Sequence, residues 1–370
     1  MNRIRVAIVC FPAHGGSGKV AVELANRLDP EHHDVKLVCT KRPTGLAEPV
    51  PFVPVQVESY PLFEHAPYAL AVGSELIRLA EGPGLDVIHV HYALPHAASA
   101  LLARDAVRAR SGRKLRIVCT LHGTDVTSVG PIAAYEPILR YSVGSADAIT
   151  VPSVFLEREV RRQLQLPEGR LVHRIPNFVD AERFHPGPRF PRSGPLRLIH
   201  VSNLRPVKRV HDVLRAMARA RRAMTLTVVG EGPERSNLED HARRLGLSVT
   251  FTGRRDDIAD RLREAEVFVF PSEIESFGLA ALEASSCGLA VVASRAGGLP
   301  EVVEHGTSGL LFEVGDIDAL AFHLDRLAEE DSLLLSLGEA GRQSARRFRP
   351  DVAVRAYSEI YRSLTLRDDS

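Results

Sequence analysis

The fold is decided by residues 270–316, which read FPSEIESFGLAALEASSCGLAVVASRAGGLPEVVEHGTSGLLFEVGD. The stretch opens at the end of an apolar run, residues 267–270, and contains two further apolar runs at 290–293 and 310–312. A helical pattern separates the first two runs. Short β-branched runs that alternate with amphipathic stretches are typical of parallel sheets with crossover helices. We therefore expect buried, parallel strands in this part of the chain.

The same alternation continues outward through both halves of the chain. Earlier in the second half we expect strands at residues 196–201, 226–229 and 249–251, and the tail from 317 to about 364 is nearly all helical, with a break at Pro350. In the first half the expected strands are residues 3–11, 35–39, 86–90, 115–121 and 148–151. The helices expected between them are residues 19–28, 69–81, 96–110 and 133–144.

The length of 370 residues is too great for one ordinary core and suits two α/β domains. The periodicity fails between residues 176 and 194, where prolines cluster, and this predicts an interdomain linker. We expect two doubly wound, Rossmann-like domains facing a central cleft, at residues 1–176 and 177–349. The helix at about 350–366 is expected to pack back on the first domain.

Charge and composition exclude several classes of protein. Lys and Arg number 47 and Asp and Glu 46, so the formal net charge of +1 predicts no nucleic-acid partner. No stretch approaches the ~20 apolar residues of a membrane span, and we expect no stable membrane association. The four cysteines stand singly and predict buried free thiols in a reducing cytoplasm. The apolar run near the N-terminus predicts a first strand rather than a signal peptide.

The loop that follows residue 270 carries two acids with seven residues between them, Glu275 and Glu283. If Glu275 precedes a helix and Glu283 lies inside it, both carboxylates can border one elongated ligand. Carboxylates accept hydrogen bonds from sugar and ribose hydroxyls, and the helix N-terminus between them offers N–H donors to phosphates. Paired carboxylates for acid–base hydrolysis are the alternative, which the nearby cations make less attractive.

Those cations lie in residues 202–209, SNLRPVKR, at the start of the second domain's first helix. Three cations near a helix N-terminus oppose the helix dipole, so helix stability alone does not explain them. A bound anion such as pyrophosphate would explain them, and a solvated basic face is the alternative.

Three loops of the first half also carry polar residues at expected strand ends. Residues 14–18, HGGSG, can bring bare backbone to an anion or can serve as a tight glycine turn. Residues 89–96, HVHYALPH, crowd three histidines and a tyrosine, for which substrate contact and plain packing remain open; a zinc site lacks an acidic or thiol partner at helix spacing. In residues 120–125, TLHGTD, His122 can bind a ligand hydroxyl or phosphate, and Asp125 reads as a helix cap.

With residues 270–316, the GGSG loop, VGEGPE at 229–234 and SNLRPVKR in this order, the chain resembles the retaining GT-B glycosyltransferases that carry the E-x7-E motif. The resemblance covers essentially the whole chain. It implies the two-domain GT-B fold and a hexosyltransferase that uses a UDP-sugar as donor, with no metal ion and no further cofactor. The stretches HVHYALPHA, TLHGTDVT and SNLRPVKRVHDV resemble more narrowly the members that transfer N-acetylglucosamine from UDP-N-acetylglucosamine to L-malate, the first step of bacillithiol biosynthesis.

The resemblance also implies a role for each matched residue. The residues with a catalytic role would be His122, Lys208 and Glu275. Those that bind the donor would be Gly16, Asn203, Arg205, Lys208, Gly230, Arg254, Glu275, Phe277, Gly278, Leu279 and Glu283. Those that bind the acceptor would be Ser17, Tyr92, Thr124 and Arg140.

Within these sets Glu275 would contact sugar hydroxyls, Glu283 would clamp the ribose and Arg254 would lie near the uracil. Many relatives have arginine five residues before the lysine, where this chain has Asn203. Whether Asn203 or Arg205 contacts the diphosphate is therefore left open.

Other functions remain as alternatives. A related transferase could use inositol phosphate or a lipid-linked sugar as acceptor, although the helix at 96–110 contains Asp105 and lacks the aromatic anchor of a membrane-docking helix. A UDP-sugar epimerase would share the two-domain shape, and a nucleotide-sugar sensor would share the binding residues. A homodimer is also compatible with the sequence.

Overall fold

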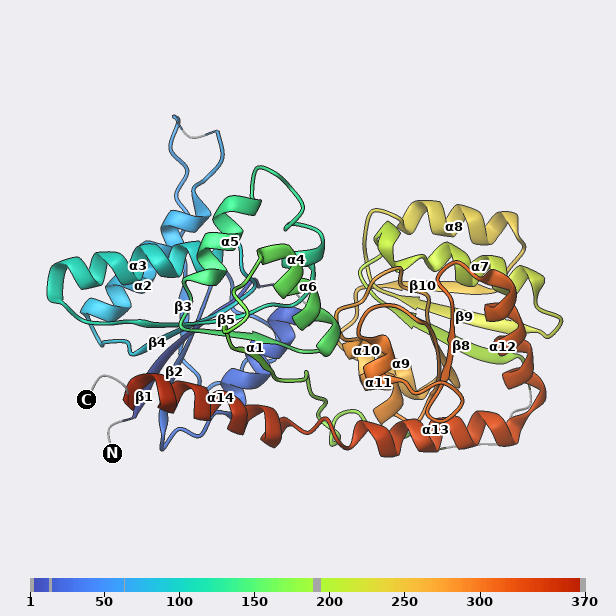
Figure 1. The fold of residues 1–370 in the computed structure, drawn as a ribbon. Helices are drawn as coiled ribbons and strands as arrows, with labels where there is room; N and C mark the ends of the chain where they lie inside the picture. The colour runs from blue at the N-terminus through green and yellow to red at the C-terminus, as the bar shows by residue number, and fades with distance from the viewer. Residues whose placement is uncertain (1–2, 13–14, 63, 189–193, 367–370) are drawn as a thin grey trace. The chain divides into compact units, whose positions relative to one another are not determined.

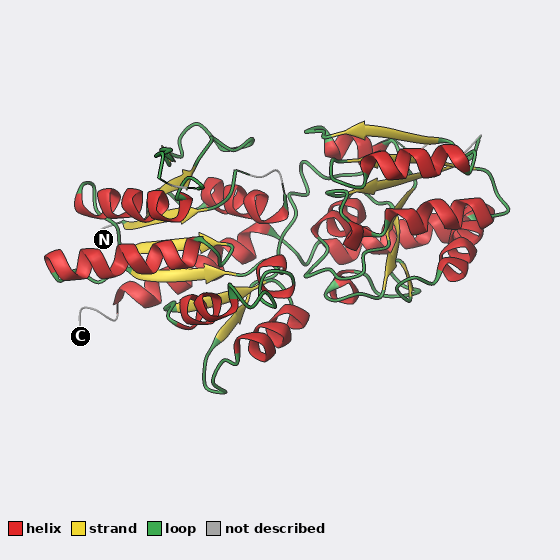
Figure 2. Cartoon of the chain, turned by 90° about the horizontal axis from the view of Figure 1, so that it is seen from above, coloured by secondary structure: helices red, strands yellow, loops and turns green. Residues whose placement is uncertain are grey.

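A computed structural model describes residues 3–12, 15–62, 64–188 and 194–366 of the chain. It divides into two compact units, the first made of Met1–Asn177 with Pro350–Ser370 and the second of Phe178–Arg349. Each unit is a parallel sheet with helices packed on its faces (Figure 1 and Figure 2).

The first unit contains strands β1 to β7 in its described residues. Their bounds are Ile4–Val9, His33–Cys39, Phe52–Pro54, Val87–His91, Arg116–Thr120, Ala148–Val151 and Val172–Arg174. The order across the sheet is β3-β2-β1-β4-β5-β6-β7, and each pairing is parallel. The helices α1 to α6 and α14 are Gly16–Arg27, Tyr68–Glu81, His96–Ser111, Thr124–Thr127, Glu136–Gly144, Val154–Leu164 and Pro350–Thr365.

The second unit repeats this plan with strands β8 to β13. Their bounds are Leu196–Val201, Met224–Val229, Val249–Gly253, Val267–Phe270, Ala290–Ser294 and Leu310–Phe312, in the order β10-β9-β8-β11-β12-β13. The 3-10 helix η1 is Pro206–Lys208, and the helices α7 to α13 are Val210–Arg219, Arg235–Arg244, Ile258–Arg263, Leu279–Ser286, Leu299–Val302, Ile317–Glu329 and Asp331–Ala345.

The expected α/β class with two doubly wound parallel sheets is confirmed. In each sheet the chain leaves the first strand toward one side and later returns to the other, which creates a switch point between β1 and β4 and another between β8 and β11. Strands β3 and β7 were not expected, because three-residue edge strands are too short to show a period in the sequence.

The expected linker at residues 176–194 is wrong for its first half. Phe178, Val179 and Phe184 are buried, and Phe184 lies in one of the second unit's hydrophobic clusters. The amide of Val179 donates to the carbonyl of Phe348 at 3.1 Å. Prolines break the helical and strand periods here, but the segment between them still buries apolar side chains against the second sheet.

The expected burial of the cysteines is confirmed, since Cys10, Cys39, Cys119 and Cys287 are all buried free thiols. Across the described ranges, no helix combines the length and the apolar character needed to cross a membrane.

Helix α14, which follows the second unit in sequence, packs on the first unit together with α1 (Figure 1). Its Tyr361 is fully buried, and the Tyr361 hydroxyl lies 2.6 Å from Nδ1 of His89 on β4. The other ring nitrogen of His89, Nε2, lies 2.7 Å from Oγ1 of Thr120 on β5. The C-terminal helix is therefore joined to the middle of the first sheet by buried hydrogen bonds.

We predict that Tyr361→Phe lowers the free energy of unfolding by about 1–2 kcal/mol, because one partner of a buried hydrogen bond is lost while the ring still fills its space. Equilibrium urea denaturation measures the change. Tyr141→Phe is the matched control, since Tyr141 is 59% exposed and its hydroxyl should contribute little. Equal stability of the two variants would contradict a role for the His89 contact.

Candidate functional site

Two segments that are distant in the sequence meet at the switch point of the second sheet. Lys208, at the end of η1, lies 2.6 Å through Nζ from Oε2 of Glu275, in the loop after β11. The same ammonium lies 5.0 Å from the centre of the Phe270 ring. The structure thus joins the basic segment to the acidic loop through a mostly buried ion pair, in which the Lys208 side chain is 16% and the Glu275 side chain 15% exposed.

The loop from Glu275 to helix α10 is held by its backbone. The carbonyl of Glu275 accepts a hydrogen bond from the amide of Gly298 at 2.8 Å. Gly278 has φ +97°, and a Cβ there would lie 2.6 Å from Leu299 Cδ2, so glycine is required. Helix α10 begins at the next residue, Leu279, and its first amides have no acceptor within the helix. Glu283 follows in the second turn and is buried.

Phe277 has a side chain that belongs to the core rather than to the loop surface. It is 2% exposed and its ring lies edge-on against Phe348, with centroids 5.4 Å apart. Its expected part in donor binding can come only from the backbone.

Gly230 lies directly after β9, where its backbone comes close to the loop after β8. It has φ +132°, and a Cβ would lie 1.8 Å from the carbonyl oxygen of Ser202. Its amide donates to the carbonyl of Gly253 at 2.9 Å. Glycine at this position lets three strand-end loops approach one another, and no larger residue fits.

Asn203, Arg205 and Arg254 have exposed side chains on the loops after β8 and β10. Within the described residues, none of these three side chains makes a hydrogen bond or ion pair. Their polar groups are therefore open to a ligand, and the structure does not choose between Asn203 and Arg205 as the diphosphate contact.

The interpretation that all cations of residues 202–209 need a bound anion is wrong for Arg209. Its Nε lies 2.7 Å from Oδ2 of Asp212, a buried acid in the first turn of α7. An acid at a helix N-terminus is favourable, and Arg209 compensates its burial. The sequence could not decide this, because an arginine three residues before an aspartate can either bind an anion or pair with that aspartate.

His200, on β8, lies near Lys208 and was not singled out from the sequence. Nδ1 lies 2.8 Å from the carbonyl of Val269 on β11, and Nε2 lies 2.7 Å from Oγ of Ser202. Burial lowers the pKa of His200 to about 4, with a further contribution from the charge of Lys208. A carbonyl can only accept, so Nδ1 carries the proton and the Ser202 hydroxyl donates to Nε2. The ring therefore joins the two strands that flank the switch point.

At the switch point of the first unit, α1 begins at Gly16 with no side-chain cap. A Cβ at Gly15 or Gly16 would contact none of the described residues within 4 Å, so they leave the backbone there uncovered. Ser17 lies in the first turn of this helix. His14, which opens the same loop in the sequence, lies outside the described residues.

Two of the expected acceptor residues contact each other across neighbouring strand ends. The Tyr92 hydroxyl, after β4, lies 3.0 Å from Oγ1 of Thr124, after β5. The buried Asp125 carboxylate binds these two loops together by accepting from the amides of Ala93 and Gly123, at 3.2 and 2.8 Å. Burial raises the pKa of Asp125, although these amide hydrogen bonds act in the opposite direction. The expected helix-cap role of Asp125 is wrong, because the N-cap residue of α4 is Gly123, no side chain caps this helix, and Asp125 lies inside its first turn.

His122 lies in the loop after β5 and is paired with a histidine of β4. Its Nε2 is 3.1 Å from Nδ1 of His91, the last residue of β4, and the rings are stacked 5.2 Å apart. Burial lowers the pKa of His122 to about 3, so the imidazole is neutral at physiological pH. It can act as a hydrogen-bond donor or acceptor but not as a cation.

Arg140 was also expected to bind the acceptor substrate, but its partners are residues other than Tyr92 and Thr124. On α5 it forms an ion pair with Glu136 one turn earlier, and its Nη1 donates to Oε1 of Gln165 at 2.8 Å. A grip on a ligand carboxylate would have to displace these two partners.

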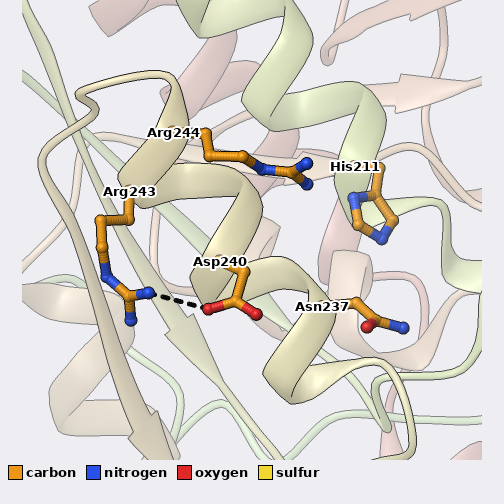
Figure 3. Close-up of a pocket in the computed structure, with 5 residues that line it drawn as sticks. All are labelled: His211, Asn237, Asp240, Arg243 and Arg244. Carbon is orange, nitrogen blue, oxygen red and sulfur yellow. Dashed lines mark hydrogen bonds and ion pairs between the residues drawn. The ribbon is translucent and has the colours of Figure 1, made fainter.

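One surface hollow lies at α5 and is lined by Glu136, Pro137, Arg140, Tyr141, Gly144 and Ser145, so it includes Arg140, a residue expected to bind the acceptor. Figure 3 shows another between α7 and α8, lined by His211, Asn237, Asp240, Arg243 and Arg244, with an ion pair of 2.8 Å between Arg243 and Asp240. None of the residues expected to bind a ligand lines it. Among the described residues, no group of three or more His, Cys, Asp or Glu side chains is placed to hold a metal ion.

Known protein families match nearly all of the chain. The family model described as Glycosyl transferases group 1 matches residues 183–344, and that described as Glycosyltransferase Family 4 matches residues 14–183. The chain is 34% identical to N-acetyl-alpha-D-glucosaminyl L-malate synthase of Bacillus anthracis, over 99% of this chain and 98% of that protein. It is 30% identical to D-inositol 3-phosphate glycosyltransferase of Streptomyces bingchenggensis, over 94% and 84%.

Solved structures agree on the fold. Sucrose-phosphate synthase from Thermosynechococcus elongatus superposes with a TM-score of 0.83 at 23% identity, over 99% of this chain and all of that one. Alr3699/HepE from Anabaena, solved with UDP and glucose, superposes with a TM-score of 0.80 at 21% identity, over 98% of this chain and all of that one.

We predict that Gly230→Ala lowers the free energy of unfolding by about 1–3 kcal/mol, because the new Cβ cannot lie 1.8 Å from the Ser202 carbonyl and the backbone must move. Amide hydrogen exchange should accelerate in residues 202–209. Gly194→Ala is the control, since a Cβ there meets no described residue within 4 Å. Unchanged exchange in residues 202–209 would show that the loops do not depend on this close approach.

Proposed function

Because the chain belongs to the GT-B glycosyltransferases, we propose that it transfers N-acetylglucosamine from UDP-N-acetylglucosamine to the hydroxyl of L-malate, with retention of the α configuration. The observation that carries the proposal is the 2.6 Å contact between Lys208 and Glu275 at a strand-end switch point, beside the N-terminus of α10. The Bacillus anthracis relative, similar over 99% of this chain, supports the acceptor. UDP in the structure of the similar Anabaena protein supports the nucleotide.

The second unit offers a separate group for each part of such a donor. Lys208, with Asn203 or Arg205, and the first amides of α10 around Gly278 and Leu279 supply positive charge and N–H donors for the diphosphate. Glu275 accepts from sugar hydroxyls and Glu283 from the ribose, since a carboxylate accepts several hydrogen bonds at once. Arg254 lies on the exposed loop after β10 and is assigned to the uracil.

In the first unit, Gly16 contributes to the diphosphate, and Ser17, Tyr92, Thr124 and Arg140 are assigned to the acceptor. L-Malate has two carboxylates, which need N–H donors or cations. The N-terminus of α1 at Gly16 and Ser17 can hold one of them, since the backbone there is open. Arg140 can hold the other if the malate carboxylate replaces Glu136 as its partner.

Retention follows if the malate hydroxyl attacks on the face that the diphosphate leaves. The bond from the anomeric carbon to the phosphate oxygen breaks, the bond to the malate oxygen forms, and the leaving phosphate oxygen takes the hydroxyl proton. Lys208 and the α10 amides stabilise the charge on the leaving group. His122, neutral, donates or accepts a hydrogen bond at the reacting sugar. The proposed reaction needs neither a metal ion nor another cofactor, because these groups bear the charge.

We predict different losses for the two acids of the loop. Glu283→Gln should weaken UDP binding by about one to two decades, since a charged hydrogen bond contributes about 1.5–3 kcal/mol. Glu275→Gln should mainly lower kcat with the intact donor. Calorimetry with UDP and steady-state kinetics separate the two effects. Glu273→Gln is the matched control, because Glu273 lies exposed in the same loop. Unchanged UDP affinity in Glu283→Gln would remove the ribose assignment.

We predict a single product from UDP-N-acetylglucosamine and L-malate, identified by mass and with an α anomeric signal by NMR. Activity should persist in a chelator. The acceptor panel includes inositol phosphate, because the Streptomyces relative is 30% identical. Transfer to that acceptor instead of malate would correct the substrate and keep the transferase. A β product would contradict retention, and exchange of hydrogen at sugar carbon two without transfer would indicate an epimerase.

A further inference from the structure

The hollow between α7 and α8 is a candidate binding site that the proposed reaction does not use (Figure 3). It has a volume of about 610 Å³. His211 lines it from α7, and four residues line it from α8: Asn237, Asp240, Arg243 and Arg244. None of them belongs to the residues assigned to the donor or to the acceptor. All five carry polar groups, so a ligand held here must itself be polar.

The arginines of α8 differ in how their charges are compensated. Nη1 of Arg243 lies 2.8 Å from Oδ1 of Asp240, and Arg235 is paired with two acids. Among the described residues, the guanidinium of Arg244 has no hydrogen-bond or ion-pair partner, and Figure 3 shows it pointing across the hollow toward α7. The side-chain amide of Asn237 also has no partner in this part of the chain. Arg244 and Asn237 are therefore open to a ligand.

His211 is linked to a second histidine and to an acid. Its Nδ1 lies 2.8 Å from Nδ1 of His241, and its Nε2 lies 3.3 Å from Oε2 of Glu234. Burial is the main cause that lowers the pKa of His241. The neighbouring charges of His211, Arg215 and Arg244 lower this pKa further. The histidine pair thus lies in a positive field, which a bound anion would offset.

We propose that this hollow binds a phosphate monoester that carries hydroxyl groups, such as a sugar phosphate. The guanidinium of Arg244 donates paired N–H bonds to the phosphate oxygens, and the amide of Asn237 donates to the same group. The contact between Arg243 and Asp240 uses Oδ1 of the carboxylate. Oδ2 of Asp240 is left to accept a hydrogen bond from a hydroxyl of the ligand.

The residues of the hollow favour this ligand over other polar molecules. A phosphate monoester presents three terminal oxygens, which suffice for the guanidinium and the Asn237 amide at once, whereas a carboxylate presents two. A divalent cation would be repelled by Arg244. A neutral sugar would leave the charge of Arg244 uncompensated. The inference does not depend on the proposed reaction, because it uses none of the residues assigned to that reaction.

NMR of histidine-labelled protein tests the proposal with glucose 6-phosphate as the probe. The His211 and His241 signals are those missing from His211→Gln and from His241→Gln. We expect both signals of the wild type to shift with a Kd of about 1 mM or lower. Inorganic phosphate should bind more weakly, because it lacks the sugar hydroxyls that reach Asp240, and glucose should not shift either signal.

Matched variants locate the bound phosphate. Arg244→Gln should raise the Kd for glucose 6-phosphate by about tenfold or more, since it removes charged hydrogen bonds. Arg219→Gln is the control, because Arg219 lies on α7, is 51% exposed and does not line the hollow. Lys208→Gln changes the proposed donor site and should leave the titration of the two histidine signals unchanged. Asp240→Asn should reduce the preference for glucose 6-phosphate over inorganic phosphate.

No saturable shift of the wild-type His211 signal at about 10 mM glucose 6-phosphate would overturn the proposal, and this measurement needs no variant to fold. Equal losses in Arg244→Gln and Arg219→Gln would also overturn it, because they would indicate attraction to surface charge in general. Equal binding of glucose 6-phosphate and inorganic phosphate would disprove the hydroxyl contact. A protein that transfers no sugar but shows the expected shifts would disprove the proposed function and support this site.

Discussion

Every strand pairing among the described residues is parallel, and the carboxyl ends of the strands in each sheet therefore share one edge. Loops that leave two such strands in opposite directions separate at the switch point and leave room for a ligand. This is why Lys208 and Glu275, 67 residues apart, can contact. Gly230 lets strand-end loops approach one another, and Gly16 leaves a helix N-terminus uncovered. Both lie at these edges because the strands of each sheet run in one direction.

Buried neutral histidines organise both edges. His200 joins β8 to β11, and the pair His91 and His122 joins the ends of β4 and β5. Burial lowers the pKa of each well below neutrality, so these rings hold loops together by hydrogen bonds without adding charge. The positive charge that an anionic donor requires is therefore left to lysine, arginine and helix amides. The geometry of the loops should therefore vary little with pH near neutrality.

The sequence interpretations that failed were local explanations of residues whose partners are distant. Prolines at 176–194 suggested a linker, yet Val179 and Phe184 are buried in the second unit, where the Val179 amide donates to the Phe348 carbonyl and the Ser286 hydroxyl donates to the Phe184 carbonyl. Arg209 was attributed to a bound anion, yet the buried Asp212 accounts for it. The buried contacts of His89 with Tyr361, 272 residues later, have no local signal at all. Pattern analysis detects periods and spacings, whereas burial depends on which surfaces meet.

The sequence by itself determined the alternation of strands and helices, the division into two α/β halves and the candidate residues of the loops 202–209 and 271–283. These features are local, since a strand run, a helix period and a two-acid spacing can be read within about twenty residues. Only the tertiary structure decided that Lys208 pairs with Glu275, that Tyr92 meets Thr124, that Arg140 is already engaged by Glu136, and that His91 contacts His122. The physical reason is that hydrogen bonds and ion pairs act over about 3 Å, and that closeness between distant residues comes from strand order and packing rather than from sequence spacing.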